Sequence, residues 1–253
     1  MIQITLIRLE DYGPWTTTLG DDREHKLQIL QARLYSDIQE QFSKRNGLVF
    51  FNRFDEMFAV SNGISKDEHK KILEIISTSY NNLTISMNIG RGSTPYKAHE
   101  NAKIATNNSN GNSNRVYDDN NGGNDDGNPL VQIMHVDIDG STSKVSSVML
   151  PYDISILVTR LNLALSEAFL AYGALTFFLG GDNFMIVSSR LSKGVVKTLL
   201  DKTMSTLNLR LKCGIGVASN ARSAAMLATR ALDMIREMRK SNVKYDNVLE
   251  LVS

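Results

Sequence analysis

The chain contains an internal duplication, and this feature limits its possible folds more than any other. Residues 50–57 (FFNRFDEM) match residues 177–184 (FFLGGDNF), so Asp182 lies 127 positions after Asp55. The same offset carries one apolar helical stripe onto another, because Leu27, Leu30, Leu34, Ile38 and Phe42 correspond to Ile154, Leu157, Leu161, Leu165 and Phe169. After the second helix of each copy the offset becomes 126, which indicates one deleted loop residue. Two copies of one folding unit are therefore predicted.

Each copy is predicted to have the same order of elements. Hydrophobic periodicity predicts a strand, a long helix, two strands joined by a tight turn, a second helix, a further strand and a closing helix. These elements are residues 2–10, 23–44, 47–52, 55–61, 66–80, 83–89 and 95–105 in the first copy, and 130–138, 151–172, 174–179, 183–189, 192–206, 209–217 and 220–240 in the second. The predicted fold class is α+β, with two tandem ferredoxin-like βαββαβ domains, each an antiparallel four-stranded sheet with helices on one face.

An asparagine-rich stretch separates the two copies. Nine of the 22 residues from 107 to 128 are Asn, and only Val116 and Tyr117 are apolar or aromatic. Such a segment buries too little surface to offset its loss of conformational entropy, so it is predicted to be a flexible loop or linker. The predicted domains are therefore residues 1–106 and residues 129–253.

Composition narrows the class of protein. Hydrophobic residues make up 42% of the chain, which is ordinary for a globular protein. The formal net charge is +1 and there is no long Lys or Arg run, so we expect no nucleic-acid partner. No apolar stretch approaches the ~20 residues needed to cross a bilayer and no signal peptide is recognisable, so we expect no membrane partner and a cytoplasmic location. Cys213, the single cysteine, is expected to be a small buried residue.

In the second copy, two acidic segments are predicted to meet at one edge of the sheet. Asp137 and Asp139 end the first strand and share a face, because side chains alternate along a strand. Asp182 follows the glycine pair 180–181 in the hairpin turn, and in a βαββαβ sheet the first strand lies beside this hairpin. The two carboxylates of Asp137 and Asp182, with the backbone carbonyl of Ile138, would form a hard oxygen site for Mg²⁺.

Small residues after the first strand complete this predicted site. Gly140, Ser141 and Thr142 are candidates for holding phosphate through their backbone N–H groups, and Lys144 and Arg222 are isolated basic candidates for the same role. Taken separately, a D-x-D pair at a strand end is often a turn-forming pair, and a Gly-Gly-Asp hairpin is usually structural. Their joint placement favours a metal and nucleotide site in the C-terminal domain.

The motifs carry a family resemblance. The hairpin at residues 180–184 (GGDNF) resembles the signature of diguanylate cyclases, and each copy resembles the palm domain of nucleotidyl cyclases. The duplicated chain as a whole resembles the archaeal GTP cyclohydrolase III family. That resemblance covers nearly the full chain, in the family's order, at residues 11–16 (DYGPWT), 27–28 (LQ), 33–35 (RLY), 53–55 (RFD), 135–139 (HVDID), 180–185 (GGDNFM) and 214–216 (GIG). The chain departs from the family in its asparagine-rich linker and in Glu10, where Asp is expected.

The resemblance implies an activity, ligands and site residues. It implies Mg²⁺-dependent hydrolysis of GTP to a formylaminopyrimidine ribonucleotide monophosphate that feeds flavin and deazaflavin synthesis. Two Mg²⁺ ions are expected, a monovalent cation such as K⁺ is a further expected ion, and the chain is expected to form a homo-oligomer, a dimer or a tetramer. The predicted catalytic residues are Asp137, Asp182 and Asn183, the predicted metal ligands are Asp137, Ile138 and Asp182, and the predicted nucleotide-binding residues are Ile138, Asp139, Gly140, Ser141, Thr142, Gly180, Gly181, Asp11, Tyr12 and Asp55.

Alternatives to this reading stay open. One is a nucleotidyl cyclase, although Asn183 stands where active diguanylate cyclases carry an acidic residue that helps to activate the 3′-hydroxyl. Another is a catalytically inactive GTP-binding sensor. In the N-terminal copy, Asp11, Tyr12, Trp15 and Asp55 either face the nucleotide of the second copy or only hold the domain interface.

The four histidines are assigned mainly structural or surface roles. His135 shares the strand face of Asp137, where it is either a structural residue or a proton donor near neutral pH. His25, His69 and His99 lie in polar helical contexts and are predicted to be solvated.

Overall fold

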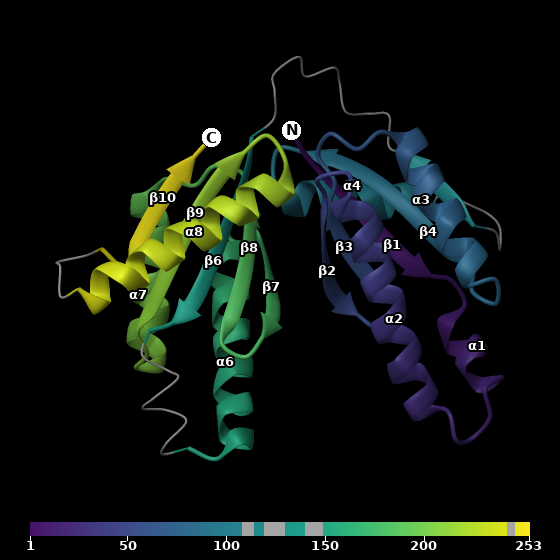
Figure 1. Cartoon of the computed structure of the whole chain (residues 1–253), viewed down its shortest axis with the longest axis horizontal. Helices are drawn as coiled ribbons and strands as arrows, with labels where there is room; N and C mark the ends of the chain where they lie inside the picture. Colours follow the sequence, from purple (N-terminus) through teal and green to yellow (C-terminus); the bar gives the residue numbers. More distant parts are fainter. Residues whose placement is uncertain (108–113, 119–129, 140–148, 242–245) are drawn as a thin grey trace. The chain divides into compact units, whose positions relative to one another are not determined.

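A computed structural model shows the fold of the chain (Figure 1). It describes residues 1–107, 114–118, 130–139, 149–241 and 246–253. The chain divides into two compact units, which we describe one at a time. Unit 1 comprises residues Met1–Ser93 and Lys97–Gly127, and unit 2 comprises residues Thr94–Tyr96 and Asn128–Ser253.

Unit 1 is built around a mixed sheet. Its elements are β1 (Ile2–Leu9), α1 (Tyr12–Thr17), α2 (Glu24–Ser43), β2 (Leu48–Arg53), β3 (Glu56–Val60), α3 (Lys66–Ser79), β4 (Ile85–Gly92), α4 (Pro95–Asn107) and β5 (Arg115–Asp118). Among the described residues, the strand order is β2-β3-β1-β4-β5. The first four strands pair antiparallel, and β5 pairs parallel with β4.

Unit 2 repeats this plan. Its elements are β6 (Val131–Ile138), α6 (Pro151–Leu170), β7 (Leu175–Gly180), β8 (Asn183–Ser188), α7 (Lys193–Leu207), β9 (Leu211–Ala218), α8 (Ala221–Lys240) and β10 (Val248–Val252). The strand order over the described residues is β10-β9-β6-β8-β7, and only β10 pairs parallel with its neighbour. No helix in the described parts of either unit is both long and apolar enough to span a bilayer.

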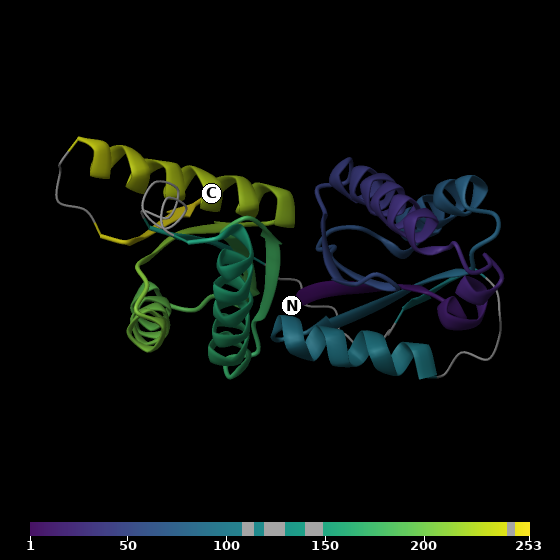
Figure 2. The same ribbon diagram turned by 90° about the horizontal axis from the view of Figure 1, so that it is seen from below.

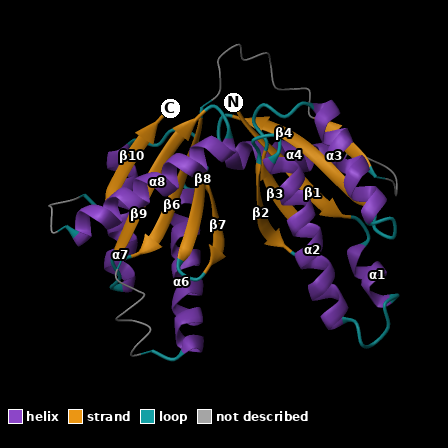
Figure 3. Ribbon diagram, viewed as in Figure 1, coloured by secondary structure: helices purple, strands orange, loops and turns teal. Residues whose placement is uncertain are grey.

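The predicted fold class is confirmed. In both units the four strands of the βαββαβ core lie in the order second, third, first, fourth, which is the ferredoxin-like arrangement. The secondary structure follows the duplicated pattern closely, with strands and helices at corresponding positions of the two units (Figure 3). The predicted elements are therefore present in both copies, and each copy forms its own hydrophobic core.

The apolar stripes that revealed the duplication form these cores. Leu34, Ile38 and Phe42 of α2 are fully buried against the sheet of unit 1. Leu161, Leu165 and Phe169 of α6 take the same places in unit 2. The helical spacing of three and four residues puts each set on one face, so burial of that face drives the packing.

The prediction that helices cover only one face of each sheet is wrong. Figure 2 shows that α6 and α7 lie on one side of the unit 2 sheet and α8 on the other. Glycines on the sheet make this close packing possible: a Cβ atom on Gly216 would lie 2.0 Å from the carbonyl oxygen of Ala224 in α8. In unit 1 a Cβ atom on Gly90 would lie 2.2 Å from the carbonyl oxygen of Ala98 in α4. Glycine and alanine together let the helix backbone rest directly on the strand.

The linker prediction is wrong for residues 115–118, which form strand β5 at the edge of the unit 1 sheet. The side chain of Asn114 accepts a hydrogen bond from the backbone N–H of Ile85, and Arg91 forms an ion pair with Asp118. Main-chain pairing and these side-chain contacts order a segment that has few apolar residues. Residues 108–113 and 119–128 of the predicted linker lie outside the described residues.

Two of the three histidines that were predicted to be solvated are not. His69 in α3 is fully buried, and its ring nitrogens lie 2.7 Å from the Thr5 hydroxyl and 2.8 Å from the Ser65 carbonyl oxygen. His99 is half-buried against the ring of Phe58. Burial lowers the pKa of both imidazoles below the ordinary value. Cys213 is fully buried and free, as expected.

Candidate active site

The candidate site lies at one end of β6, where the sheet register brings three side chains together. Asp137 pairs with Asn183 on β8 and with Lys212 on β9. Residues directly opposite each other on neighbouring strands share a face, so all three side chains point toward the side covered by α8. Asp137 is 4% exposed, which makes it a buried carboxylate that needs partners.

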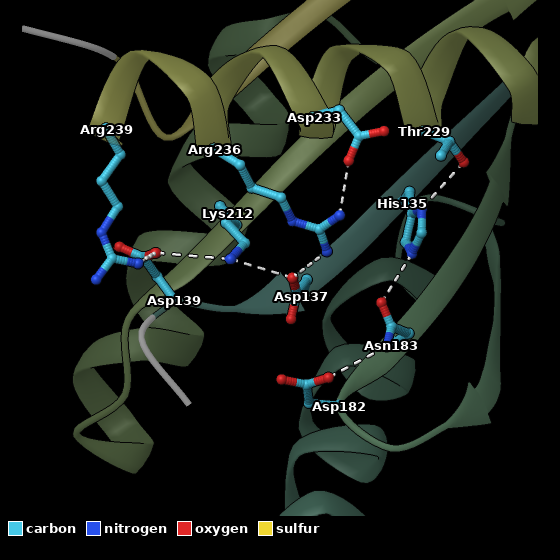
Figure 4. A network of polar contacts seen from close by, with 10 residues as sticks. All are labelled: His135, Asp137, Asp139, Asp182, Asn183, Lys212, Thr229, Asp233, Arg236 and Arg239. Carbon is cyan, nitrogen blue, oxygen red and sulfur yellow. Dashed lines mark hydrogen bonds and ion pairs between the residues drawn. The ribbon is translucent and has the colours of Figure 1, made fainter. Parts of the chain in front are cut away.

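Basic side chains from β9 and α8 supply those partners (Figure 4). The Oδ2 atom of Asp137 lies 3.1 Å from the Nζ atom of Lys212 and 2.6 Å from the Nη2 atom of Arg236. Arg236 also contacts Asp233 at 2.7 Å on the same helix. Charge-assisted contacts of this length offset the cost of burying the Asp137 carboxylate.

Asp139 holds a second cation at the strand end. Its Oδ1 atom lies 2.7 Å from the Nη1 atom of Arg239 and 3.7 Å from the Nζ atom of Lys212. Lys212 thus bridges the carboxylates of Asp137 and Asp139. The sequence reading that placed these two carboxylates on one face agrees with this shared contact.

Formal charge at the site is almost balanced. The residues drawn in Figure 4 include four aspartates against one lysine and two arginines, which gives −1 with His135 neutral. Partial burial acts to lower the pKa of Arg236, but hydrogen bonds to Asp137 and Asp233 outweigh it and raise that pKa. A polyphosphate would therefore meet donors that are always charged, but it would need an added cation to offset the aspartates.

The hairpin turn contributes a chain of hydrogen bonds. Gly180 and Gly181 have φ values of 112° and 61°, a conformation that favours glycine, and they turn the chain into Asp182. The Nδ2 atom of Asn183 donates to the Oδ1 atom of Asp182 at 3.1 Å. The Oδ1 atom of Asn183 lies 3.0 Å from the Nε2 atom of His135. Asn183 therefore links the Asp182 carboxylate to the strand beside it.

His135 completes this chain as a neutral residue. Its Nδ1 atom lies 3.2 Å from the Thr229 hydroxyl of α8. Burial, the largest cause, lowers the pKa of His135, although the bond with Asn183 acts in the opposite direction. Because Asn183 presents its oxygen to Nε2, this atom carries the hydrogen, and Nδ1 accepts from Thr229. The arrangement fits the structural interpretation of His135 better than that of a proton donor.

The donor set suits a magnesium ion that keeps water and phosphate ligands. Within the described residues, no three His, Cys, Asp or Glu side chains gather as a metal site. Asp137 and Asp182 offer two carboxylates from neighbouring elements, and both ion pairs of Asp137 use Oδ2 rather than Oδ1. Mg²⁺ is commonly held by one or two carboxylates together with substrate phosphates, so these residues fit it.

The structure describes only some of the predicted site residues of unit 2. Asp137, Asp182 and Asn183, the predicted catalytic residues, come together at the β6 and hairpin edge. The Ile138 side chain packs in the core, so only its carbonyl remains a candidate ligand. The predicted phosphate-binding residues Gly140, Ser141 and Thr142, together with Lys144, lie outside the described residues.

In unit 1, two of the three predicted nucleotide-binding residues line a pocket of about 770 Å³. Tyr12 and Asp55 line it, and Asp11 precedes α1 in a left-handed conformation with φ of 50°. Gln31 donates a hydrogen bond to the Tyr12 hydroxyl at 2.6 Å. The other lining residues are Thr16, Arg23, Glu24, Leu27, Gln28, Ala32, Phe51, Arg53 and Phe54.

Sequence analysis missed the cations of the site. It singled out Arg222 and Lys144, whereas the structure places Lys212, Arg236 and Arg239 on the aspartates. One signal was present: Lys212 is a charged residue between the apolar residues Leu211 and Cys213 of a predicted strand, which in the structure pairs with β6. Arg236 and Arg239 are three residues apart near the end of a helix, a spacing that a solvated helix face shows equally often.

Comparison with known proteins identifies the family. Residues 1–250 match the family model of GTP cyclohydrolase III. The chain is 41% identical over 239 residues to the GTP cyclohydrolase III of Methanothermobacter thermautotrophicus, which covers 93% of this chain and 95% of the relative. It is 39% identical over 261 aligned positions to that of Methanocaldococcus jannaschii, which covers 99% and 95%.

Solved structures show weaker similarity. The active GGEEF domain of a diguanylate cyclase from Vibrio cholerae has 13% identity and a TM-score of 0.36 over 49% of this chain and 82% of its own. A bacterial light-regulated adenylyl cyclase has 16% identity and a TM-score of 0.37 over 43% and 71%. Scores this low carry no argument about function.

The fold and the site define an α+β protein of two tandem ferredoxin-like units, with a carboxylate and cation site in the C-terminal unit. Over nearly its whole length, the chain belongs to the GTP cyclohydrolase III family.

Proposed function

We propose that this chain is a GTP cyclohydrolase that opens the imidazole ring of GTP. The observation that carries the proposal is the match to the GTP cyclohydrolase III family over residues 1–250, with relatives of that name at 39–41% identity. The site of unit 2 supports it, because carboxylates for a metal ion and cations for phosphate lie within contact of each other.

The reaction balances with water as the co-substrate. One water adds at C8 of guanine, the C8–N9 bond breaks, and C8 remains as a formyl group on the former N7. Two further waters release the outer phosphates as inorganic phosphate. The product is a formylaminopyrimidine ribonucleotide monophosphate, which would serve flavin and deazaflavin synthesis.

Residues of unit 2 would bind the polyphosphate. Arg236 and Arg239 carry permanent charge and planar donor groups that match phosphate oxygens. They are 38% and 48% exposed, so a ligand can reach them, whereas Lys212 at 9% stays between the aspartates. We expect the two arginines to share their donors between the aspartates and the phosphates when GTP binds.

Mg²⁺ would be held by Asp137, Asp182 and the carbonyl of Ile138. When bound, the ion supplies charge neutralisation at the phosphate groups. Contacts within the site support this proposal: Asn183 orients the Asp182 carboxylate, and Lys212 and Arg236 orient that of Asp137. A second Mg²⁺ and a monovalent cation such as K⁺ are part of the proposal.

Asn183 separates this activity from that of a cyclase. Both polar atoms of its amide are engaged, one with Asp182 and the other with His135. An amide has no pKa suited to accepting a proton from a 3′-hydroxyl. The residue therefore acts here as a positioning group for the Asp182 carboxylate.

We also propose a homo-oligomer, a dimer or a tetramer, in the cytoplasm. The buried free thiol of Cys213 is compatible with a reducing compartment.

The experiment that tests the activity is product analysis. Purified protein would be incubated with GTP and Mg²⁺, and the products followed by ultraviolet absorbance and mass spectrometry. The proposal predicts loss of the guanine spectrum, a ring-opened monophosphate and inorganic phosphate. A cyclic or linked dinucleotide with an intact guanine spectrum would establish the cyclase alternative. Binding of GTP without turnover would establish the sensor alternative.

A further inference from the structure

An apolar stripe runs along the outward face of α6 in unit 2. Tyr152, Ile156, Leu163 and Leu170 are 79%, 43%, 59% and 45% exposed, although all four are large hydrophobic side chains. Ile156, Leu163 and Leu170 are spaced by seven residues, which keeps them in line along the helix. The face is opposite the core stripe of Leu161, Leu165 and Phe169, so α6 is apolar on two sides.

The duplication provides an internal comparison for this stripe. At the offset of 127, the same positions on α2 of unit 1 are His25, Ile29, Ser36 and Ser43. Only Ile29, which is 49% exposed, is apolar there. The fold therefore does not require an apolar outward face on this helix. Exposed apolar stripes cost solubility, so their presence on one copy alone indicates a contact made by that copy.

Charged residues flank the centre of the stripe. Arg160 lies three residues before Leu163, and Glu167 lies four residues after it. On a helix these offsets put both side chains on the same side of Leu163, one toward each end. Both are exposed, and neither forms an ion pair with another described residue of the chain.

We propose that this stripe (Tyr152, Ile156, Leu163 and Leu170) is a self-association surface that pairs α6 antiparallel with α6 of a second copy. A two-fold axis beside Leu163 would place Ile156 against the partner's Leu170 and Leu163 against its own copy. The same axis brings Arg160 beside the partner's Glu167 twice, once in each half of the contact. A parallel pairing would instead put Arg160 and the partner's Glu167 on opposite sides of the contact.

The symmetry of the stripe indicates that its binding partner is a second copy of the chain. Ile156 and Leu170 are equally far from Leu163, and the flanking charges are of opposite sign on the two sides of that centre. A surface that is complementary to itself under a two-fold rotation is the feature of an isologous dimer interface. A different protein would not require this arrangement. The inference is independent of the proposed enzymatic activity.

A cysteine at the axis gives the most direct test. In Leu163→Cys, the two thiols would meet at the proposed axis, while the native thiol of Cys213 is fully buried. The matched control is Ser36→Cys at the corresponding position of α2, which is also exposed. Under mild oxidation we expect Leu163→Cys to form a covalent dimer at least ~10-fold faster than the control, because a preformed interface raises the effective thiol concentration. Equal rates for the two variants would overturn the proposal.

Charge reversal tests the register independently. Arg160→Glu and Glu167→Arg would each place like charges across the interface, and we expect each to increase the fraction of dissociated chains in light scattering over a concentration series. The double variant restores opposite charges and should recover the association of the native chain. Because both residues are exposed, neither change should prevent folding. Single variants that associate like the native chain, or a double variant that does not recover, would contradict the antiparallel pairing.

Discussion

The two units share a fold but differ in the charged residues at the end of the first strand and in what surrounds them. In unit 2, Asp137 lies opposite Lys212 and forms an ion pair with it, whereas the same register in unit 1 places Arg8 opposite Ser86. Arg8 forms an ion pair with Glu56, and the Ser86 hydroxyl donates a hydrogen bond to Glu10, which corresponds to Asp139. Helix α8 continues to Lys240 and brings Arg236 onto Asp137, whereas α4 ends at Asn107. Unit 2 thus has an acid surrounded by cations at the position where unit 1 has an arginine.

Unit 1 has a pocket beside its hairpin, at the end of the sheet that corresponds to the site of unit 2. Its pocket of about 770 Å³ lies between α1, α2 and the hairpin, and its lining mixes aromatic, amide and charged side chains. Its hairpin acid Asp55 forms an ion pair with Arg53 at 3.5 Å, whereas Asp182 in unit 2 is bound by an amide. The comparison teaches that the two units keep the same ferredoxin-like backbone while the charged residues at the strand ends differ.

The largest effects should appear where the two units are the same. Gly216→Ala would bring a Cβ atom within 2.0 Å of the Ala224 carbonyl oxygen, and Gly90→Ala within 2.2 Å of the Ala98 carbonyl oxygen. Since the clashing atoms are backbone, each change should destabilise its unit by about 3 kcal/mol or more. Urea unfolding would measure this loss. Tolerance of either change by less than about 1 kcal/mol would contradict the close helix contact.

Arg236 of unit 2 should affect substrate binding, whereas Ser86 at the same end of the unit 1 sheet should not. Arg236→Gln removes a charged donor from the proposed phosphate site and should raise the KM for GTP about 10- to 100-fold, as expected from losing a charged hydrogen bond of about 1.5–3 kcal/mol. The control is Ser86→Ala, at the unit 1 position that corresponds to Lys212, for which we expect a change under about 2-fold. Steady-state kinetics at saturating Mg²⁺ would measure both, and equal changes would remove the proposed difference between the units.

A buried histidine should make unit 1 sensitive to acid. His69 corresponds to Val196 in unit 2, and both are fully buried. Burial holds the folded-state pKa of His69 below its ordinary value of 6.5, so the unfolded chain binds the proton more readily. Its stabilising effect is complete above pH 6.5 and is lost as the pH falls through the folded-state pKa.

The variant His69→Val tests this pH dependence, because it introduces the residue that unit 2 has at the corresponding position, Val196. We expect the free energy of unfolding of the native chain to fall between pH 7.5 and pH 5.5, and this fall to become smaller in the variant. It should not vanish, because the pKa values of His99 and His135 are also lowered by burial. Urea titrations at both pH values would measure it, and an unchanged pH dependence in the variant would count against the buried neutral imidazole.

The smallest expected difference concerns two corresponding helix caps. Ser65 and Glu68 form a reciprocal capping box at the start of α3, whereas Ser192 caps α7 through one hydrogen bond to Val195. Ser65→Ala should therefore cost about 1 kcal/mol and Ser192→Ala about half of that. Thermal unfolding would compare them, and a larger loss at Ser192 would contradict the ranking.

Sequence periodicity was sufficient to predict the repeated hydrophobic core and the placement of the two carboxylates. Apolar stripes and strand alternation indicate which face of an element is buried, so Asp137 and Asp182 could be placed at one edge before the structure was known. The GTP cyclohydrolase III family was likewise recognisable from motifs such as residues 180–185.

The sequence did not show which side chains on different helices and strands contact each other. The periodicity of α8 shows a polar side but not which acid Arg236 reaches, because that depends on how far the helix extends over the sheet. Strand β5 was missed because its order comes from pairing with β4 rather than from its own apolar residues. His69 was missed because a polar helix sequence did not reveal that its ring points to Thr5 on the sheet.

The most direct test of the central claim compares the two hairpin acids. Asp182→Asn and Asp55→Asn make the same chemical change at corresponding positions, and kcat/KM for GTP would be measured for each with product identity checked. If unit 2 holds the reacting nucleotide and its metal ion, Asp182→Asn should lower kcat/KM by at least ~100-fold and Asp55→Asn by less than ~10-fold. The reverse order, or equal losses, would contradict the assignment of the active site to unit 2.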